Sequence, residues 1–425
     1  MKMTIVASGT RGDVQPMLAL GKALQARGHV VCVLASSHFA AWIAQHGLRP
    51  ATATVDIQAV MQSAGGTAWA EQGNDPMKQM RIMQTLVNQH GLALMDDAWQ
   101  ACQGAEVILS SFTSDLYVAS IAEKLGAIHI STPLQPVLRA TRNGAAMANA
   151  PQPNRESWLN YWVGKWLLEP VAWRLLGKLT NHFRQATLGL PPQTAHAARQ
   201  TLNRMRVIQG YSQHVAPHAA DWPANLSPAG YWFLDDEVDW QPSPTLRAFL
   251  QAGEPPIYIG FGSMAGSNPQ ALTRVLIDAV IASGQRAVLQ TGWAGLGASA
   301  LPPSIHLLER APHSRLFPLM QAVVHHGGAG TTAESLRAGK PTIIVPHMAD
   351  QPFWGRRVAA LGAGPQPIPR HKLNAAALAA AIYQATADAA IRQHAAHLGE
   401  QIRAEDGIGR AVELIEAYLL RVSKC

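Results

Sequence analysis

The sequence has few charged residues, few cysteines and no long apolar run. Lys, Arg, Asp and Glu make up 14% of the 425 residues, against roughly 25% in typical soluble proteins. The 35 glycines and 28 prolines follow no repeating period, which excludes a collagen-like or coiled-coil chain. Because 48% of the residues are hydrophobic, we expect ordinary globular cores arranged in two or three domains.

The cysteines and the N-terminus carry little targeting information. Cys32, Cys102 and Cys425 are widely separated and form no CxxC pair, so they predict neither a disulfide framework nor a zinc knuckle. The apolar stretch at residues 3–7 is too short for a signal peptide, and no stretch approaches the ~20 apolar residues of a membrane span. We therefore expect a cytoplasmic protein whose membrane contact, if any, is peripheral to the inner face.

The net charge of +7 suits an anionic ligand or an acidic membrane surface. No run of five like charges occurs in the sequence, and such a run is what would mark a nucleic-acid-binding arm. We therefore expect no nucleic acid among the partners.

The two halves of the chain repeat one pattern. Residues 3–7 predict a buried strand, followed by a glycine turn, a helix over residues 14–27 and a second strand over 30–35. After a proline-rich connector at 234–256, residues 257–261 predict a new strand with its own glycine turn. We predict an α/β fold of two doubly wound, Rossmann-like domains, at residues 1–235 and 236–408. Residues 409–425 are expected to form a final amphipathic helix that packs back on the first domain.

The first glycine turns do not match a redox dinucleotide site. Gly9 and Gly12 give a GxxG spacing, and Gly260, Gly262 and Gly266 give GxGxxxG. Neither strand that follows these turns ends in the acidic residue that holds an NAD ribose. A dinucleotide-dependent oxidoreductase is therefore disfavoured.

A third glycine turn predicts an anion site. Residues 322–326 read as a strand, 327–330 as a loop of three glycines and an alanine, and 331–337 as a helix. Backbone amides at the start of such a helix bind phosphate without needing a divalent metal. Thr331 and Glu334 also fit a capping box, in which each side chain satisfies a backbone donor of its own helix.

The tandem histidines before this loop make a poor metal site. His325 and His326 are consecutive on a strand, so their side chains point to opposite faces and cannot share one ion. We expect one of them to face the loop and the other to face the core.

Three blocks of sequence carry a resemblance to a known family. They are HHGGAGTT at residues 325–332, PHMADQPFWG at 346–355 and GTRGDVQP at 9–16. Together they resemble the nucleotide-sugar glycosyltransferases of the GT-B fold, in the branch of sterol glucosyltransferases and of the bacterial glycopeptide and macrolide enzymes. The resemblance implies two domains that face a central cleft, a nucleotide sugar as co-substrate, and neither a metal nor a further cofactor.

The resemblance also implies a donor site in the second half. Gly328, Ala329, Gly330, Thr331 and Thr332 match the loop that holds the diphosphate, and His326 and Ser263 match two further phosphate contacts. Glu334 matches the acid that reaches the ribose, and Asp350 and Gln351 match the pair that binds the sugar hydroxyls. Arg310, Ala311 and His313 align with the base-binding segment. Arg310 stands where plant relatives have a stacking tryptophan, so the base meets either a guanidinium stack or backbone atoms near Ala311 and His313.

Asp13 is the expected general base. Many relatives carry a histidine at this position of the first loop, and here the resemblance places Asp13, with Gly12 beside the acceptor. A carboxylate is ionised at neutral pH and needs no partner to select a tautomer. The alternative is an N-cap, in which Asp13 accepts from the amides of the helix that follows.

A cluster of tryptophans has three alternative interpretations. Trp158, Trp162 and Trp166, with Trp173 beyond, fall within an arc of about 80° on one helical face. Pro170 is expected to kink or restart this helix. The side chains either pack in the core, line a pocket for an apolar acceptor, or rest on a membrane.

The sequence thus predicts an inverting, metal-independent transferase that moves a hexose from a nucleotide diphosphate to a small hydrophobic acceptor. The acceptor is expected to be a sterol, lipid, polyketide or phenolic compound, and UDP-glucose is the first choice of donor. The alternatives are a rhamnosyl or deoxysugar transferase that uses a dTDP donor, an epimerase of the same fold, and a non-catalytic activator of a partner transferase.

Overall fold

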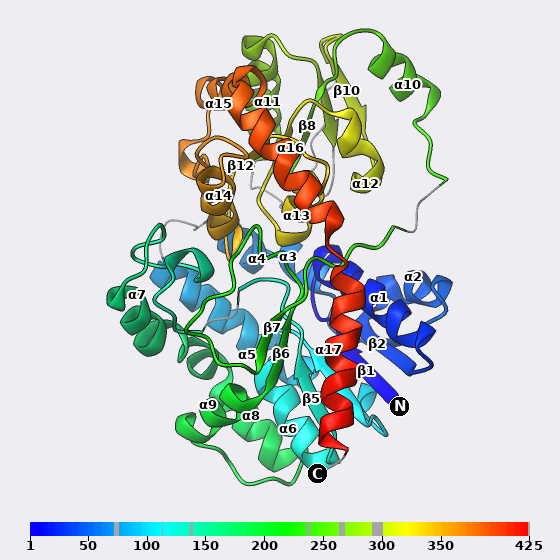
Figure 1. Cartoon of the computed structure of the whole chain (residues 1–425), viewed down its shortest axis with the longest axis vertical. Coiled ribbons are helices and arrows are strands. Elements are labelled where there is room, and N and C mark those ends of the chain that lie inside the picture. The colour runs from blue at the N-terminus through cyan, green and yellow to red at the C-terminus, as the bar shows by residue number, and fades with distance from the viewer. Residues whose placement is uncertain are drawn as a thin grey trace. The chain divides into compact units, whose positions relative to one another are not determined.

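The computed structural model describes residues 1–71, 76–112, 114–136, 139–235, 239–262, 268–290 and 301–423. The chain divides into two compact units, each of which contains one sheet of parallel strands (Figure 1). The first unit comprises Met1–Val60, Met80–Leu234 and Glu405–Cys425, and the second comprises Met61–Gln79 and Asp235–Ala404. The α/β fold with two parallel sheets that the sequence predicts is therefore confirmed.

The first unit contains a seven-stranded sheet in the order β3-β2-β1-β4-β5-β6-β7. Its strands are β1 (Lys2–Val6), β2 (Val30–Ser36), β3 (Arg49–Ala53), β4 (Val107–Ser110), β5 (Ile128–Ser131), β6 (Arg206–Gln209) and β7 (Leu226–Pro228). The strand order reverses beside β1, which pairs with β2 on one side and with β4 on the other. The loops that follow β1 and β4 therefore diverge at the carboxyl edge, where doubly wound sheets bind their ligands.

The helical segments of residues 11–204 lie between the strands of this sheet in the sequence, and those within Met61–Gln79 belong to the second unit. They are α1 (Arg11–Ala26), η1 (Ser37–Phe39), α2 (Ala40–Gln45), α3 (Ile57–Gln62), α4 (Ala64–Glu71), α5 (Pro76–Ala101), α6 (Asp115–Leu125), η2 (Gly144–Ala146), α7 (Trp158–Val163), η3 (Gly164–Leu168), α8 (Val171–Ala186) and α9 (Ala195–Arg204).

Apolar side chains of β1 alternate between the two faces of the sheet. Met3 and Ile5 belong to one buried cluster, whereas Val6 belongs to a second cluster on the other face. The C-terminal helix α17 (Gly407–Val422) contributes Ile415 and Leu419 to the first cluster and packs beside α1, as Figure 1 shows. Residues from both ends of the chain thus share the core of the first unit.

The second unit contains a five-stranded sheet in the order β10-β9-β8-β11-β12. Its strands are β8 (Ile257–Gly260), β9 (Ala287–Gln290), β10 (Ile305–Leu308), β11 (Val323–His325) and β12 (Thr342–Ile344). The helical segments are α10 (Pro244–Gln251), α11 (Pro269–Ser283), α12 (His313–Leu316), η4 (Phe317–Leu319), α13 (Ala329–Arg337), α14 (Gln351–Ala360), η5 (Arg370–Lys372), α15 (Ala375–Ala387) and α16 (Ala389–Ala404).

The strand order of this sheet reverses beside β8. Because β8 pairs with β9 on one side and with β11 on the other, the loops after β8 and β11 diverge at the carboxyl edge. The glycine turn at residues 327–330 follows β11 and therefore lies at this switch point. Within the described ranges, no helix is both long and apolar enough to cross a bilayer.

Candidate functional site

The turn after β11 places a histidine ring against two glycines. A Cβ atom on Gly328 would lie 2.6 Å from Nε2 of His326, and one on Gly262 would lie 3.2 Å from its Cε1. Gly327, between the histidine and the helix, has a φ of +90°, a value that side chains other than hydrogen rarely allow. The turn therefore requires glycine for both its conformation and its packing around His326.

The helix after this turn begins earlier than the sequence predicts. Gly328 is the N-cap of α13, and Ala329 and Gly330 are its first helical residues, so the predicted start at Thr331 is wrong by two residues. The amides of Ala329, Gly330 and Thr331 have no acceptor within the helix, because the first turn of any α-helix lacks preceding carbonyls. These amides and the helix dipole form the anion-binding end of α13.

Thr332 stabilises the turn itself. Its amide and its hydroxyl group both donate to the carbonyl oxygen of Gly328, each at 2.9 Å. The side chain is buried. Its contact with a diphosphate remains a prediction.

His326 carries a neutral ring at physiological pH. Burial lowers its pKa to about 4, and its Nδ1 atom is buried without a hydrogen-bond partner among the described residues. The neighbouring His325 is fully buried in the core, where its Nδ1 accepts from the amide of Gly327 at 2.9 Å. His325 thus lies in the core, as predicted for one of the two histidines, and also accepts from the turn, whereas His326 packs against Gly328 in the turn.

Glu334 does not form the capping box that its spacing with Thr331 permits. Because the N-cap is Gly328 and no side chain caps α13, that interpretation is wrong. Glu334 is instead buried, and its Oε2 atom has no hydrogen-bond partner among the described residues. Arg337 Nη1 is 3.9 Å from this oxygen, and Arg337 forms its two shorter contacts, of 2.6 and 2.7 Å, with Asp235. Burial raises the pKa of Glu334 to about 7. The carboxyl group therefore keeps an acceptor oxygen for a ligand hydroxyl.

A strained loop holds Asp350 and Gln351 after β12. Ala349 has a φ of +54°, which is costly for a residue with a Cβ and is found mostly at functional sites. Asp350 is the N-cap residue of α14, and its Oδ2 accepts from Nε1 of Trp354 at 2.6 Å. The Gln351 Oε1 accepts from the amides of His347 and Met348, at 2.8 and 3.1 Å. Both side chains are thus fixed by their own loop, and their contacts with a sugar remain predictions.

The base-binding segment predicted by the sequence follows β10. Arg310 is exposed and Ala311 is buried, and His313 opens α12. The His313 ring stacks on Phe317, with ring centroids 4.4 Å apart. Since β10 is parallel to the other strands, this segment lies at the same carboxyl edge as the turn after β11. Ser263 lies outside the described residues.

Asp13, in the first unit, is held by the residue that begins its helix. Thr10 is the N-cap of α1, and Asp13 accepts from the Thr10 amide at 2.8 Å and from its hydroxyl group at 3.1 Å. Asp13 therefore closes a capping box as the third helical residue, and its interpretation as the N-cap is wrong. A Cβ on Gly9 would lie 2.2 Å from Oδ2 of Asp13, so the loop needs glycine there as well.

The electrostatics of Asp13 favour a role as a base. Burial raises the pKa of this carboxyl group, while the two hydrogen bonds from Thr10 lower it and only partly offset the rise. Both bonds go to Oδ2, and the described residues give none to Oδ1. Asp13 follows β1, so it lies at the switch point of the first sheet, with Gly12 exposed beside it.

A second buried carboxyl group at this edge was missed by the sequence reasoning. Asp115 is the first residue of α6, and Ser114 is the N-cap. The Asp115 oxygens accept from Ser110 Oγ at 2.5 Å and from Ser131 Oγ at 2.6 Å. Ser110 and Ser131 end the neighbouring strands β4 and β5 at the same register. The sequence offered one sign of this group: a serine, Ser110 or Ser131, ends each of the two apolar strands.

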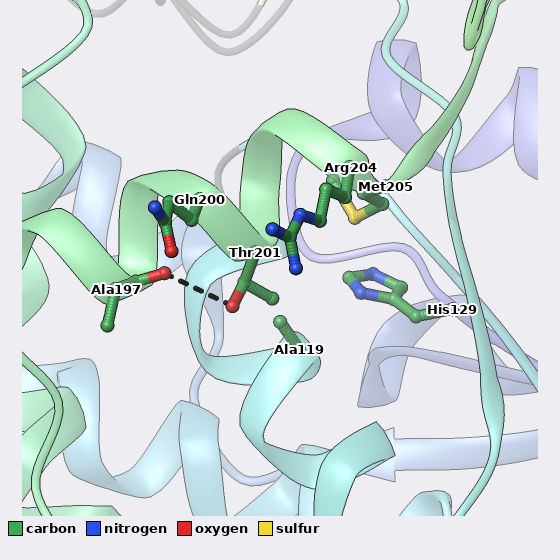
Figure 2. A pocket seen from close by; sticks show the side chains of 7 residues that line it. All are labelled: Ala119, His129, Ala197, Gln200, Thr201, Arg204 and Met205. Carbon is green, nitrogen blue, oxygen red and sulfur yellow. Dashed lines mark hydrogen bonds between the residues drawn. The ribbon is translucent and has the colours of Figure 1, made fainter.

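The hydrogen-bonded group around Asp115 reaches a cavity in the first unit. Nε2 of His129 is 2.7 Å from Ser110 Oγ, and burial lowers the pKa of His129 to about 3. His129 faces a cavity of about 410 Å³ between α6, β5 and α9 (Figure 2). The lining residues are Ala119, His129, Ala197, Gln200, Thr201, Arg204 and Met205. None of the predicted acceptor residues is among them.

The predicted acceptor tryptophans are at the surface. Trp158, Trp162 and Trp166 are 62%, 49% and 57% exposed, so the core-packing interpretation is wrong for these three residues. The helix restarts where Pro170 predicts: α7 continues into a π-helical turn that ends at Leu168, and Pro170 is the N-cap of α8. An acceptor contact remains a prediction.

Family models match one segment in each half of the chain. Residues 3–123 match the N-terminal domain of glycosyltransferase family 28. Residues 275–414 match the C-terminal domain of proteins like the erythromycin biosynthesis protein CIII.

Full-length comparisons agree with this assignment. The chain is 35% identical to a sterol 3-beta-glucosyltransferase of Emericella nidulans and 34% identical to one of Aspergillus terreus. Each match covers 98% of this chain, but the chain spans only 30% of the length of these relatives.

Solved structures resemble the chain over nearly its whole length. A glycosyltransferase of kitacinnamycin and a calicheamicin glycosyltransferase both superpose with a TM-score of 0.69, at 19% and 18% identity. They cover 98% and 99% of this chain, and the chain covers 98% of each. A spinosyn rhamnosyltransferase in complex with thymidine diphosphate has a TM-score of 0.62 at 18% identity, over 98% of this chain and 100% of its own.

Proposed function

Because this chain belongs to the glycosyltransferases of the GT-B fold, we propose that it transfers a hexose from a nucleotide diphosphate to a hydroxyl group of a small hydrophobic acceptor. The observation that carries this proposal is the turn after β11. There, the open amides of α13 and the neutral ring of His326 offer hydrogen-bond donors around one position at a switch point. A diphosphate is the ligand that such a set of donors fits.

UDP-glucose is the donor that we favour. In this proposal Glu334 accepts from the ribose hydroxyls with its unpartnered oxygen, and Asp350 and Gln351 bind the hydroxyls of the glucose. A dTDP-linked rhamnose or deoxysugar is the alternative, supported by the resemblance to a rhamnosyltransferase solved with thymidine diphosphate. Thermal unfolding with UDP-glucose, dTDP-glucose and dTDP-rhamnose separates the two donor classes, because a ligand that binds the folded state more tightly raises the melting temperature further.

Transfer is proposed to proceed with inversion at the anomeric carbon. Asp13 takes the proton of the acceptor hydroxyl group as its oxygen attacks this carbon. The bond from the carbon to the diphosphate oxygen breaks at the same time, and the electron pair leaves with the nucleotide diphosphate. The amides of α13 and His326 then bind the charge that develops on the leaving group. Every proton and electron pair is accounted for without a cofactor.

We expect transfer to be independent of divalent metal. The dipole of α13 and the hydrogen bonds at its start offset the charge of the diphosphate, which is the task a metal performs in other transferases. Initial rates should therefore be the same in excess EDTA and in added Mg²⁺ or Mn²⁺. A loss of transfer in EDTA that Mg²⁺ restores would contradict this expectation.

Glu334 should make donor affinity depend on pH. Because burial raises its pKa to about 7, the carboxylate that accepts both ribose hydroxyls forms only as the pH rises through about 7. The KM for the donor should fall over this range in the wild type. The pH dependence of kcat should instead reflect the ionisation of Asp13. In Glu334→Gln the KM should be higher and should no longer change with pH. If the KM for the donor changes equally with pH in both proteins, Glu334 does not contact the donor.

The same shift predicts a change in stability. The pKa of Glu334 lies above its ordinary value of 4.5, so the folded state holds a proton that the unfolded state releases. The free energy of unfolding should therefore fall as the pH rises from 4.5 to about 7. Melting temperatures of Glu334→Gln should show a smaller fall over this interval than those of the wild type.

The acceptor is proposed to be apolar, such as a sterol, a lipid, a polyketide or a phenolic compound, and the protein to work in the cytoplasm at the inner face of a membrane. The sterol glucosyltransferases among its relatives support this acceptor class.

The decisive experiment follows UDP-glucose consumption with and without mixed hydrophobic alcohols and measures product masses. Consumption that requires an alcohol, with a product heavier by one hexose, supports transfer. Consumption without an alcohol indicates an epimerase or a hydrolase, and no consumption in either case indicates a non-catalytic homologue.

A further inference from the structure

Five large apolar side chains lie at the surface around α7, a segment at the outer side of the first unit (Figure 1). They are Trp158, Leu159, Trp162, Trp166 and Leu167, each between 49% and 62% exposed, and we call them the tryptophan patch. Single exposed apolar residues are common, but a contiguous group of this size marks a surface that binds something.

Internal contacts fix the direction in which the patch faces. The side chain of Asn160 is fully buried. Its Oδ1 accepts from the amide of Gln152 at 2.9 Å, and its Nδ2 lies 3.0 Å from the carbonyl oxygens of Arg142, Gln152 and Arg155. One turn later, Gly164 is buried so closely that a Cβ would lie 2.8 Å from Cα of Ala140. Because residues 160 and 164 face inward, residues 158, 162 and 166 must face outward.

Cationic side chains border the aromatic rings. The guanidinium carbon of Arg142 is 5.3 Å from the ring centroid of Trp158, although Nε of Arg142 also lies 3.8 Å from Asp221. Nζ of Lys165 is 5.3 Å from the ring centroid of Tyr161 and 3.2 Å from its hydroxyl oxygen. The patch therefore combines exposed apolar groups with cationic side chains at its border.

We propose that the tryptophan patch docks the protein on an anionic phospholipid bilayer. Tryptophan favours the boundary between headgroups and acyl chains, where the ring is desolvated and its N–H group stays hydrated. Leu159 and Leu167 add apolar area, and Arg142 and Lys165 lie where lipid phosphates would be. The two bordering cations favour an anionic bilayer over a neutral apolar acceptor as the occupant. This inference deepens the membrane contact of the proposed function, but it requires no transfer activity.

Co-sedimentation with vesicles, without nucleotide sugar or acceptor, tests the inference. The wild type should bind vesicles of phosphatidylcholine mixed with phosphatidylglycerol and should bind pure phosphatidylcholine more weakly. The triple variant Trp158→Ser, Trp162→Ser, Trp166→Ser should bind these vesicles about a hundredfold or more weakly. Its surface no longer carries the three rings whose partial insertion removes apolar area from water. Since these side chains are exposed, the variant should keep the melting temperature of the wild type.

Two control proteins make the result specific. The triple variant Ile281→Ser, Tyr383→Ser, Leu420→Ser removes equally exposed apolar side chains elsewhere and should bind vesicles like the wild type. The double variant Arg142→Gln, Lys165→Gln, which removes the two cations beside the patch, should lose about fivefold per charge on the anionic vesicles only. The inference is overturned if the tryptophan variant binds vesicles like the wild type. It is also overturned if the patch substitutions change only self-association or only acceptor affinity.

Discussion

Replacing Asp13 with asparagine should leave nucleotide-sugar binding intact and lower the rate of transfer by about 10²–10⁴, the usual effect of removing one general base. The side-chain amide oxygen that Asp13→Asn introduces is too weakly basic to take the proton. It can still accept from Thr10, so the capping box of α1 should survive. Transfer rates with a saturating donor, together with calorimetric donor titration, measure the two effects separately. Turnover near that of the wild type would show that Asp13 has a structural role.

A control variant separates the capping role of Asp13 from its role as the base. Thr10→Val removes the hydroxyl donor to Asp13 but keeps the backbone amide and the carboxylate. It should slow transfer far less than Asp13→Asn does.

The pH dependence of transfer gives a second test of Asp13. Since burial raises the pKa of Asp13, the acid limb of the wild-type transfer rate plotted against pH should lie above the ordinary pKa of ~3.9 for Asp. An acid limb at or below that value would argue against a partly buried carboxylate base.

Gly328→Ala should lower donor affinity by about ten- to a hundredfold, as expected if the one charge-assisted hydrogen bond from His326 to the diphosphate is lost. Its φ of −60° and ψ of 143° are accessible to alanine, so the backbone need not change. The added Cβ would lie 2.6 Å from Nε2 of His326, and the ring must leave its position. Donor affinity is measured by calorimetry, and the melting temperature should stay close to that of the wild type.

Two further variants test the cause of this loss. Gly91→Ala places a Cβ at ordinary contact distances of 3.7–3.9 Å, and it should bind the donor normally. In the double variant Gly328→Ala, His326→Ala the clash is absent, so its loss should be smaller than the sum of the two single losses. Full additivity, or unchanged affinity in Gly328→Ala, would contradict the proposed arrangement of His326.

Local patterns in the sequence were sufficient to predict the architecture. Apolar strands followed by glycine turns recur in both halves, and they become β1 and β8, the strands beside which the two sheets reverse their order. The start of α13 was harder to predict, because Ala329 and Gly330 resemble loop residues in sequence although they occupy its first turn. Gly328 at the N-cap leaves no side-chain signal of the boundary, and helix ends are commonly uncertain by about two residues.

Contacts between distant residues could not be predicted. Asp115 meets Ser110 and Ser131 only because β4 and β5 pair in register. The spacing of the tryptophans predicted one helical face, but helical periodicity does not say whether that face is buried. The buried hydrogen bonds of Asn160, to residues that lie up to 18 positions away, decide the orientation.

The proposed function depends on a diphosphate bound at the start of α13. The most direct test is a crystal structure of the protein soaked with UDP-glucose at a saturating concentration. We expect both phosphates within hydrogen-bond distance of the amides of Ala329, Gly330 and Thr331, with the His326 ring beside them. A nucleotide sugar bound elsewhere, or no density at this helix terminus, would contradict it.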